Sequence, residues 1–482
     1  MSVHISDSAI YRNSWATPEL RALFDDTALT AGWIEVMVVL AETQAEFGLI
    51  PAETAKQLAD ACRVVQLDEA FFTEVREDFE RTNHSLLGLI RALQHRCPRD
   101  SGEWLCYGAT VQDITDTHTA RILVEVRDIF EDQLASTARV LCDLVRRYRN
   151  TPMCGRTHGQ PGLPITFGFK AAGWLDEIHR HRQRLNEVGA RLGVGQLAGG
   201  VGSLSSFGTE ALALQRRFLE RLGLTAPAVS WTASRDRLAE WLNLLALITA
   251  TADRIGHEIY NLQRPEIGEL SEGFVPGTVG SITMPQKRNP EIAEHLGTLA
   301  RVVRYQAAHM GENLVHDHER DGRAWKGEWA LLPGACLATG KALALLHDLL
   351  EHLEVNVERM WDNLLATKGF LQAEHVMLGL APKLGKQSAH ALVYRLAMDA
   401  AAHGTPLREA VLAESQIVAQ LGVAGIESLF DVGQSTGCCA QMVDCVLAQA
   451  EALSPGRGQE LFQDEMNVAS GGISSPLPSG EG

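Results

Sequence analysis

The sequence predicts an all-α protein, and three observations support this prediction. Apolar residues recur at helical spacing over several long segments, and no sustained two-residue alternation of β-branched residues accompanies them. Stretches rich in glycine and proline separate these segments, as is typical of loops between helices. The chain of 482 residues, of which 45% are hydrophobic, is long enough for about three domains with a large buried core.

The clearest predicted helix covers residues 122–145. Its apolar side chains, from Ile122 to Val145, recur at steps of three to five residues, and charged residues such as Arg127 and Glu131 fall between them. Similar spacing predicts further helices at about 165–192, 237–262, 294–312 and 332–357. Such helices exceed the mean length of about 11 to 12 residues, so they need long partners from this chain or from other subunits. A helical bundle is therefore expected.

The breaks between helices suggest the domain organisation. Residues 196–208 and 271–291 are rich in glycine and are predicted to be loops, and a third loop is expected near 106–113. We expect an N-terminal helical domain at 1–112, a central long-helix domain at 113–364 and a C-terminal helical domain at 365–453. The tail, residues 454–482, is rich in Gly, Ser and Pro and is predicted to be disordered.

Charge and composition argue against several classes of protein. A net charge of −17 gives no basic footprint for nucleic acid. The apolar stretch 241–252 has about twelve residues, whereas a bilayer span needs about twenty, so it is expected to be a core helix and no membrane partner is predicted. The N-terminus shows no secretory signal, which makes the cytoplasm the expected location. Nine cysteines without a C-x-x-C pair fit reduced thiols better than disulfides or a zinc site.

One segment, residues 280–294, combines residue types that suit carbanion chemistry. Asn289 is expected to cap the following helix with Pro290 in its first turn, and the exposed amides of a helix start favour an anion. Removing a proton next to a carboxylate builds up negative charge, which Lys287 and Asn289 are suited to stabilise. Ser281 follows a glycine-rich stretch whose backbone N–H groups can converge on one point, as a serine base requires. From composition alone, this segment could equally be a polar surface loop followed by a capped helix.

The amino-acid sequence of this segment resembles that of a known protein family. GSITMPQKRNPEIAE resembles the signature of the fumarase/aspartase superfamily, written G-S-S-x-M-P-x-K-x-N-P. Segment 105–117 is similar to the superfamily's first conserved region, and GRTHGQPGLPITFG (155–168) is similar to its T-H-x-Q element. WTASRDRLAEW (231–241) resembles the Q-R-D segment that leads into a core helix. The resemblance covers about residues 10 to 450.

The resemblance implies roles for particular residues. Ser281 would be the general base, Lys287 and Asn289 would hold the activated carboxylate, and His158 would be the acid-side or charge-relay group, oriented by Glu294. It also implies a three-domain fold in which a long helical bundle forms the core of a homotetramer, with each site built from three subunits and with no metal or organic cofactor. The further substrate-binding candidates are Thr157, Gln160, Thr110, Ser203, Arg235 and Met284.

Within the superfamily, 231–241 and HERDGRAWKGEW (318–329) are most similar to the branch of adenylosuccinate lyase and 3-carboxy-cis,cis-muconate cycloisomerase. The lyases carry a Ser-rich stretch ending in Glu-Arg that grips a phosphate, where this chain has residues 325–329, Trp-Lys-Gly-Glu-Trp. Their early Arg-Tyr is replaced by Ser14-Trp15. We therefore do not expect a nucleotide substrate. The retained His158 favours elimination over cycloisomerisation, because bacterial cycloisomerases commonly have tryptophan there.

The expected activity is β-elimination from a small succinate-type dicarboxylate to give fumarate, as in carbon–nitrogen lyases. Departures from the branch at Cys106, Val111, Ala233, Ser234 and Gln286 suggest an unusual leaving group, and nitrosuccinate, giving fumarate and nitrite, is the first specific expectation. The alternatives are a 3-carboxy-cis,cis-muconate cycloisomerase, an amino-acid or adenylosuccinate-type lyase, and an inactive structural homologue. The intact Ser281 and its partners argue against the last of these.

Overall fold

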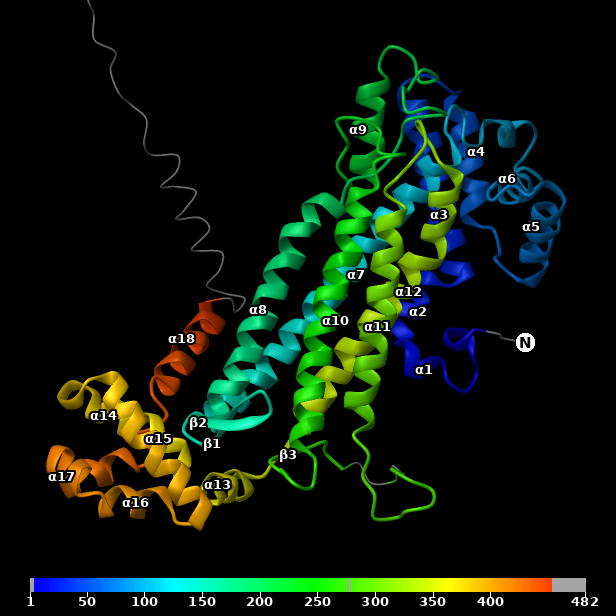
Figure 1. Cartoon of the computed structure of the whole chain (residues 1–482). Coiled ribbons are helices and arrows are strands. Elements are labelled where there is room, and N and C mark those ends of the chain that lie inside the picture. The colour runs from blue at the N-terminus through cyan, green and yellow to red at the C-terminus, as the bar shows by residue number, and fades with distance from the viewer. Residues whose placement is uncertain (1–3, 275–276, 278, 453–482) are drawn as a thin grey trace, which may run out of the picture. The chain divides into compact units, whose positions relative to one another are not determined.

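The computed structural model describes residues 4–274, 277 and 279–452, and the tail predicted to be disordered lies outside these residues. The prediction of an all-α protein is confirmed: the described strands form only two small two-stranded sheets, and the rest of the regular structure is helical (Figure 1). Contacts divide the described chain into two compact units. Unit 1 comprises residues 4–135, 181–258 and 279–349, and unit 2 comprises 136–180, 259–274 with 277, and 350–452. The domain boundaries expected after residues 112 and 364 stay predictions.

The N-terminal part of unit 1 is a cluster of short helices around α3. Asp25 caps α3 and Asp68 caps α5 through side-chain bonds to backbone N–H groups, as these residue types favour. α3 packs against α4 and α9, and its fully buried Val36 and Leu40 belong to their shared core. The helices of this part are η1 Ile5–Asp7, α1 Arg12–Trp15, α2 Pro18–Phe24, α3 Asp26–Glu46, α4 Ala52–Arg63, α5 Glu69–Thr82, α6 Leu87–Gln94, η2 Ser101–Trp104 and α9 Ala211–Arg221.

Five long helices confirm the predicted bundle elements: α7 Val111–Arg147, α8 Phe167–Leu192, α10 Asp236–Leu262, α11 Glu291–Glu312 and α12 Gly322–Glu351. α7 begins inside the loop expected at 106–113, and α12 ends six residues before the predicted end at 357. Within unit 1, Trp241 of α10 stacks on Phe130 of α7 with ring centroids 5.9 Å apart, and its indole N–H donates to the Sγ of Cys336 on α12. These three helices therefore share one core.

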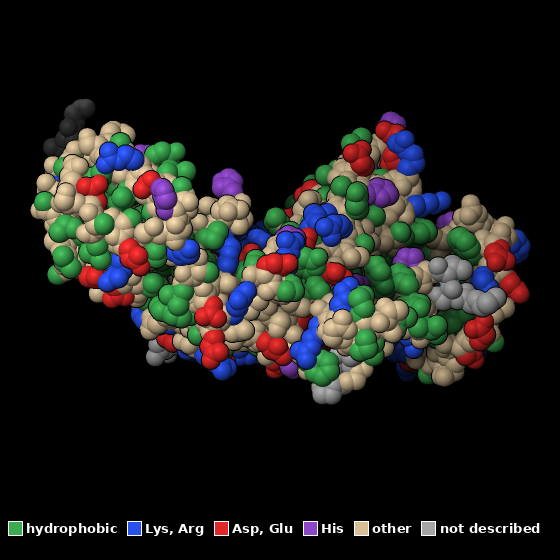
Figure 2. Space-filling model, turned by 60° about the horizontal axis from the view of Figure 1, so that its bottom comes forward, with side chains coloured by type: hydrophobic (Ala, Val, Ile, Leu, Met, Phe, Trp, Pro, Cys, Tyr) green, Lys and Arg blue, Asp and Glu red, His purple; other side chains and the backbone are tan. Residues whose placement is uncertain are grey.

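The apolar stretch that begins at Trp241 is part of α10, and Trp241 is fully buried, as expected of a core helix. Among the described residues, α12 is the one helix long and apolar enough to cross a membrane by length and composition alone. Because 56% of its most apolar window is buried, it fits a core helix as well. On the face shown in Figure 2, acidic and basic side chains are interspersed with apolar ones. That face therefore carries no continuous basic stripe among the residues it draws in colour.

Unit 2 contains both sheets and the C-terminal helices. β1 Pro152–Thr157 pairs antiparallel with β2 Gln160–Thr166, and β3 Leu270–Ser271 pairs with β4 Glu354–Val355. These strands were not predicted from the sequence. α14 packs on α15 and α17 around the fully buried Val376, Leu380 and Ile417. The helices are α13 Val357–Ala366, η3 Phe370–Gln372, α14 Ala373–Leu384, α15 Lys386–His403, α16 Leu407–Ala413, α17 Ser415–Leu429 and α18 Cys439–Ala452.

Candidate active site

The predicted T-H-x-Q element forms the tip of the β1–β2 hairpin in unit 2. Thr157 pairs with Gln160, which leaves His158 and Gly159 as a two-residue turn with φ of 54° and 75°. Two successive positive φ values define the turn type that best fits the twist of a hairpin, and a glycine at the second position adopts it without steric cost. Thr157, His158 and Gln160 are all exposed at this tip. The hairpin therefore presents the imidazole on a short, defined turn.

The hairpin is anchored next to His158 by a buried ion pair. The guanidinium of Arg156 donates to both carboxylate oxygens of Glu269, at 2.8 and 2.6 Å. The Glu269 side chain is fully buried, and the amide of Asn363 on α13 donates to it at 2.8 Å. A planar fork meeting a carboxylate along two parallel bonds fixes direction as well as distance. The turn is thereby held to the segment before β3 and to α13.

The signature loop in unit 1 is closed by Asn289. Its side-chain amide donates to the carbonyl oxygen of Gly280 at 2.7 Å, so the two ends of the loop are joined. A Cβ on Gly280 would lie 2.5 Å from the carbonyl oxygen of Lys287, which explains why glycine is needed there. Ser281 lies inside the closed loop, and its Oγ accepts from the backbone N–H of Met284 at 3.1 Å. The loop thus has a defined shape around the proposed base.

The expectation that Asn289 caps α11 is wrong. α11 begins at Glu291, the cap position is Pro290, and no side chain makes a capping hydrogen bond there. The amide of Asn289 is used for the loop closure instead, and it also contacts Glu291 at 3.3 Å. Glu294 lies in the first turn of α11 and is exposed, as are Met284 and Lys287 in the loop before it.

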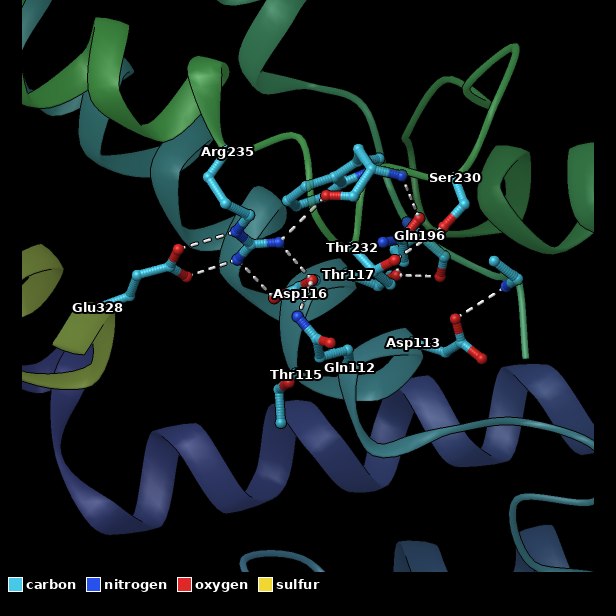
Figure 3. A network of polar contacts seen from close by, with 12 residues as sticks. Gln112, Asp113, Thr115, Asp116, Thr117, Gln196, Ser230, Thr232, Arg235 and Glu328 are labelled. Carbon is cyan, nitrogen blue, oxygen red and sulfur yellow. Dashed lines mark hydrogen bonds and ion pairs between the residues drawn. The ribbon is translucent and has the colours of Figure 1, made fainter. Parts of the chain in front are cut away.

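A second set of candidates surrounds the start of α7, where Asp113 joins two loops (Figure 3). The fully buried carboxylate of Asp113 accepts from the backbone N–H groups of Thr110, Ala198 and Gly199 at 2.8 to 2.9 Å. Burial raises the pKa of Asp113 to about 6, against the opposing effect of these three hydrogen bonds. Thr110 is half-buried, and Ser203 is exposed in the glycine-rich loop that Asp113 holds.

The same glycine-rich loop is tied to α7 one turn further on. The hydroxyl of Thr117 donates to the carbonyl oxygen of Gln196 at 2.6 Å and accepts from the N–H of Gln196 at 2.9 Å. The side-chain oxygen of Gln196 accepts from the N–H of Trp231 at 3.2 Å. These bonds connect segments 105–117 and 231–241 through the loop at 196–208. The sequence predicted that loop as a separate element.

Arg235, a substrate-binding candidate from the sequence, lies at the centre of a buried ion-pair network (Figure 3). Its guanidinium donates to both oxygens of Asp116, at 2.8 and 3.0 Å, and to both oxygens of Glu328, at 2.8 and 2.5 Å. Burial alone would lower the pKa of Arg235, but the two carboxylates outweigh it and the pKa lies above its ordinary value. Burial raises the pKa of Glu328 in turn. Arg235 is therefore committed to contacts within the protein.

Sequence reasoning gave no role to Asp113, Asp116, Glu328, Arg156 or Glu269. Asp113 and Asp116 lie in segment 105–117, and Glu328 lies in segment 318–329, both of which carry the family resemblance. Each of the three is a buried charged residue on a helix. The signal that could have identified them is an acidic residue interrupting an otherwise buried helical face, since charges are almost never buried without a partner. Their partners lie far away in the sequence, so the pairing itself could not be read from the chain.

The chain belongs to the fumarase/aspartase superfamily of lyases, as its matches to known families and relatives show. Residues 12–304 match the family described as Lyase, and residues 369–446 match the family described as Adenylosuccinate lyase C-terminus. The predicted superfamily and branch are thereby confirmed.

Relatives across several activities match nearly the whole chain. It is 40% identical to an N-acetyl-S-(2-succino)cysteine lyase from Enterococcus italicus, over 93% of this chain and 98% of that one, and 37% identical to an adenylosuccinate lyase from Methanothermobacter thermautotrophicus, over 91% and 97%. Among solved structures, a fumarate lyase from Mesorhizobium sp. covers 90% of this chain and 98% of its own, with 32% identity and a TM-score of 0.83.

Proposed function

We propose that this enzyme releases fumarate from a succinyl thioether, with a thiol as the second product. The observation that carries this proposal is the 40% identity to an N-acetyl-S-(2-succino)cysteine lyase over almost the full length of both chains. A second lyase of the same name, from Dickeya dadantii, is 36% identical over 94% of this chain. The name of these relatives describes a substrate in which succinate is joined to a cysteine sulfur.

The proposed reaction is a β-elimination. Ser281 removes a proton from the carbon next to the C–S carbon, and the electron pair is delocalised onto the neighbouring carboxylate, which is held by Lys287 in the loop that Asn289 closes. The C–S bond then breaks, sulfur departs with the bonding electrons as a thiolate, and the new double bond gives fumarate. Because an ordinary thiol has a pKa of about 8.5, a thiolate leaves with little help from an acid. His158 would supply a proton when the leaving group needs one.

The closed signature loop supports the role of Ser281. A serine base needs its alkoxide surrounded by donors, and the bond from the Met284 N–H already directs one donor at the Ser281 Oγ. The loop also carries the exposed cation Lys287. We assign Arg235 a positioning role, because its guanidinium is bound to Asp116 and Glu328.

We also propose that the active assembly is a homotetramer in which three subunits contribute to each site. Beside Ser281, the side chains of Ile282 and Met284 are 95% and 43% exposed in the single chain. Large apolar side chains next to a catalytic group are expected to be covered in the working enzyme. Light scattering combined with activity at decreasing protein concentration tests this: a fully active monomer would exclude it. The predicted cytoplasmic location belongs to the same proposal.

Nitrosuccinate remains the second candidate substrate. It is favoured by the departures at Cys106, Val111 and Gln286, which lie in or beside segments proposed to contact substrate. Nitrite, like a thiolate, leaves as a stable anion, so the proposed chemistry of Ser281 would serve both substrates.

The deciding experiment is a substrate panel followed by the ultraviolet absorbance of fumarate. The panel contains N-acetyl-S-(2-succino)cysteine, nitrosuccinate, adenylosuccinate and 3-carboxy-cis,cis-muconate, with thiol and nitrite measured separately. We expect the thioether to give the highest kcat/KM, with thiol and fumarate released in equal amounts. The turnover of 3-carboxy-cis,cis-muconate is followed by the loss of its own absorbance, because its cyclisation releases no fumarate. Faster turnover of any other compound would replace the thioether proposal, and turnover of none of them would favour an inactive homologue. Ser281→Ala is the control for a contaminating activity.

A further inference from the structure

A pocket of about 280 Å³ in unit 1 lies between α7 and the segment that follows α9. One wall is a stripe of α7 residues spaced three to four apart, which places them on one face of the helix. The polar members of this stripe are His118, Arg121, Glu125 and Asp128, and the facing wall includes Leu222 and Leu224. None of these residues belongs to the candidate active site.

His118 is a buried imidazole whose polar atoms are not used inside the protein. The residue is 8% exposed, and neither ring nitrogen has a hydrogen-bond partner among the described residues. Its ring packs on the backbone of Gly32 in α3, where an added Cβ would lie 1.8 Å from the ring Cε1. Burial lowers the pKa of His118 to about 4, and the charge of Arg121 acts in the same direction. The neutral ring has one N–H donor and one acceptor, and buried polar groups of this kind are normally paired, which points to a ligand in the pocket.

The pocket also contains two opposite charges that do not neutralise each other. Arg121 and Glu125 lie four residues apart on α7, but neither side chain forms a hydrogen bond or an ion pair within the part of the chain that the structure describes. A basic residue placed before an acidic one at this spacing is the weaker orientation for a helix ion pair. The remaining charge, Asp128, is bonded to Arg127. The pocket therefore presents one available cation and one available anion to a ligand.

The ligand that matches these charges is a small zwitterion. A guanidinium binds a carboxylate through two parallel bonds, and a glutamate carboxylate accepts bonds from an ammonium group. Arg121 and Glu125 are separated by about 6 Å along the helix axis, so their long side chains can reach the two charged groups of one α-amino acid. Leu222, Leu224 and Ile122 add apolar surface for the ligand's side chain. A ligand with only one kind of charge would leave either Arg121 or Glu125 facing it without a counter-charge.

We propose that this pocket binds a free α-amino acid with an apolar side chain. Its carboxylate is held by the guanidinium of Arg121 and by the N–H of the His118 ring. Its ammonium group donates to Glu125, and its side chain packs against Leu222 and Leu224. The site uses none of the proposed catalytic or substrate-binding residues, so it does not depend on the proposed function.

The test is calorimetric titration of the full-length protein with L-leucine and two analogues that each lack one charge. N-acetyl-L-leucine has no ammonium group and L-leucinamide has no carboxylate, so we expect each to bind about tenfold or more weakly than L-leucine. Arg121→Met and Glu125→Gln should each weaken L-leucine binding by about tenfold or more. The matched control is Arg139→Met, which removes an exposed arginine from the same helix and should change the affinity by less than about twofold.

Four results would overturn the inference: no binding of L-leucine, equally tight binding of N-acetyl-L-leucine, unchanged affinity in Arg121→Met, or displacement of L-leucine by fumarate. The second would mean that the pocket takes any small anion, and the last would place L-leucine in the dicarboxylate site. Should Arg121→Met not fold, Glu125→Gln alters an exposed side chain and decides the question by the same comparison. Binding is measured without turnover, so a failure of the proposed function would leave this result unchanged.

Discussion

Arg156 and Glu269 form a two-bond ion pair one residue before the Thr157–Gln160 turn, and the Glu269 side chain is fully buried in it. This pair is the contact that ties the His158 turn to the segment before β3. Its consequences can be measured separately from those of His158 itself.

Glu269→Gln should weaken both the fold and the activity. The amide cannot accept both guanidinium bonds, and loss of one partner of a buried pair typically costs about 3–5 kcal/mol. We expect a clear fall in the free energy of unfolding and a lower kcat at saturating substrate, because the turn is no longer fixed. The matched control is Arg191→Lys, which alters the exposed pair with Glu240 and should cost less than about 1 kcal/mol. Equal effects in denaturant titrations of the two variants would contradict the anchoring role.

Asp113 should make stability depend on pH. Burial raises the pKa of Asp113 in the folded chain to about 6, above the 3.8 of a free aspartate, so the folded state binds the proton more tightly. The stabilisation from protonation is complete below about pH 4 and is lost as the pH rises through 6. A shift of about two units corresponds to about 3 kcal/mol.

Between pH 4 and 8, the free energy of unfolding of the wild type should decline as Asp113 loses its proton. The free energy of unfolding of Asp113→Asn should lack this decline. The comparison between the two proteins removes the contributions of other titrating groups. Parallel pH profiles would mean that Asp113 titrates as it does in the unfolded chain.

Gly280→Ala should open the signature loop. The added Cβ would meet the Lys287 carbonyl oxygen at 2.5 Å and the Asn289 nitrogen at 3.2 Å, and both are backbone atoms that cannot rotate away. We expect a loss of activity of at least tenfold, with little change in helix content by circular dichroism. Gly173→Ala in α8 is the control, since nothing lies within 4 Å of its added Cβ. Activity unchanged in Gly280→Ala would show that the closed loop is not required.

The helices could be predicted from the sequence because each carries its own signal. In α7, the buried positions Val126, Phe130, Leu134 and Leu141 repeat at helical spacing whatever surrounds them. The polar contacts of the site could not be predicted, because they join residues far apart in the chain. Arg156 and Glu269 are separated by 113 residues, and Arg235 is 119 and 93 residues from Asp116 and Glu328. The loop closure by Asn289 was missed for a local reason, because an asparagine just before a helix also favours the cap position, where its side-chain oxygen accepts a backbone N–H bond.

Ser281→Ala should abolish most turnover while leaving dicarboxylate binding in place. General acid–base steps contribute about 10²–10⁴-fold, so we expect a loss in kcat of at least that size. The substitution also removes the acceptor for the Met284 N–H, but Asn289 still closes the loop. Fumarate affinity, measured by calorimetry, checks that the site persists. Near-normal turnover of the true substrate by this variant would refute the assignment of Ser281 as the base.

His158 should report on the leaving group, provided that the turn is kept intact. His158 has a positive φ of 54°, which asparagine tolerates better than alanine, so His158→Asn is the preferred variant. A thiolate or nitrite departs as a stable anion, whereas an amine or alkoxide needs a proton as the bond breaks. We therefore expect His158→Asn to reduce kcat by less than about tenfold on the succinyl thioether and by about 10²-fold or more on an amine-releasing analogue. Rates for wild type and variant on both substrates decide between the roles: an equal loss on both would mean that His158 binds or positions the dicarboxylate instead of protonating the leaving group.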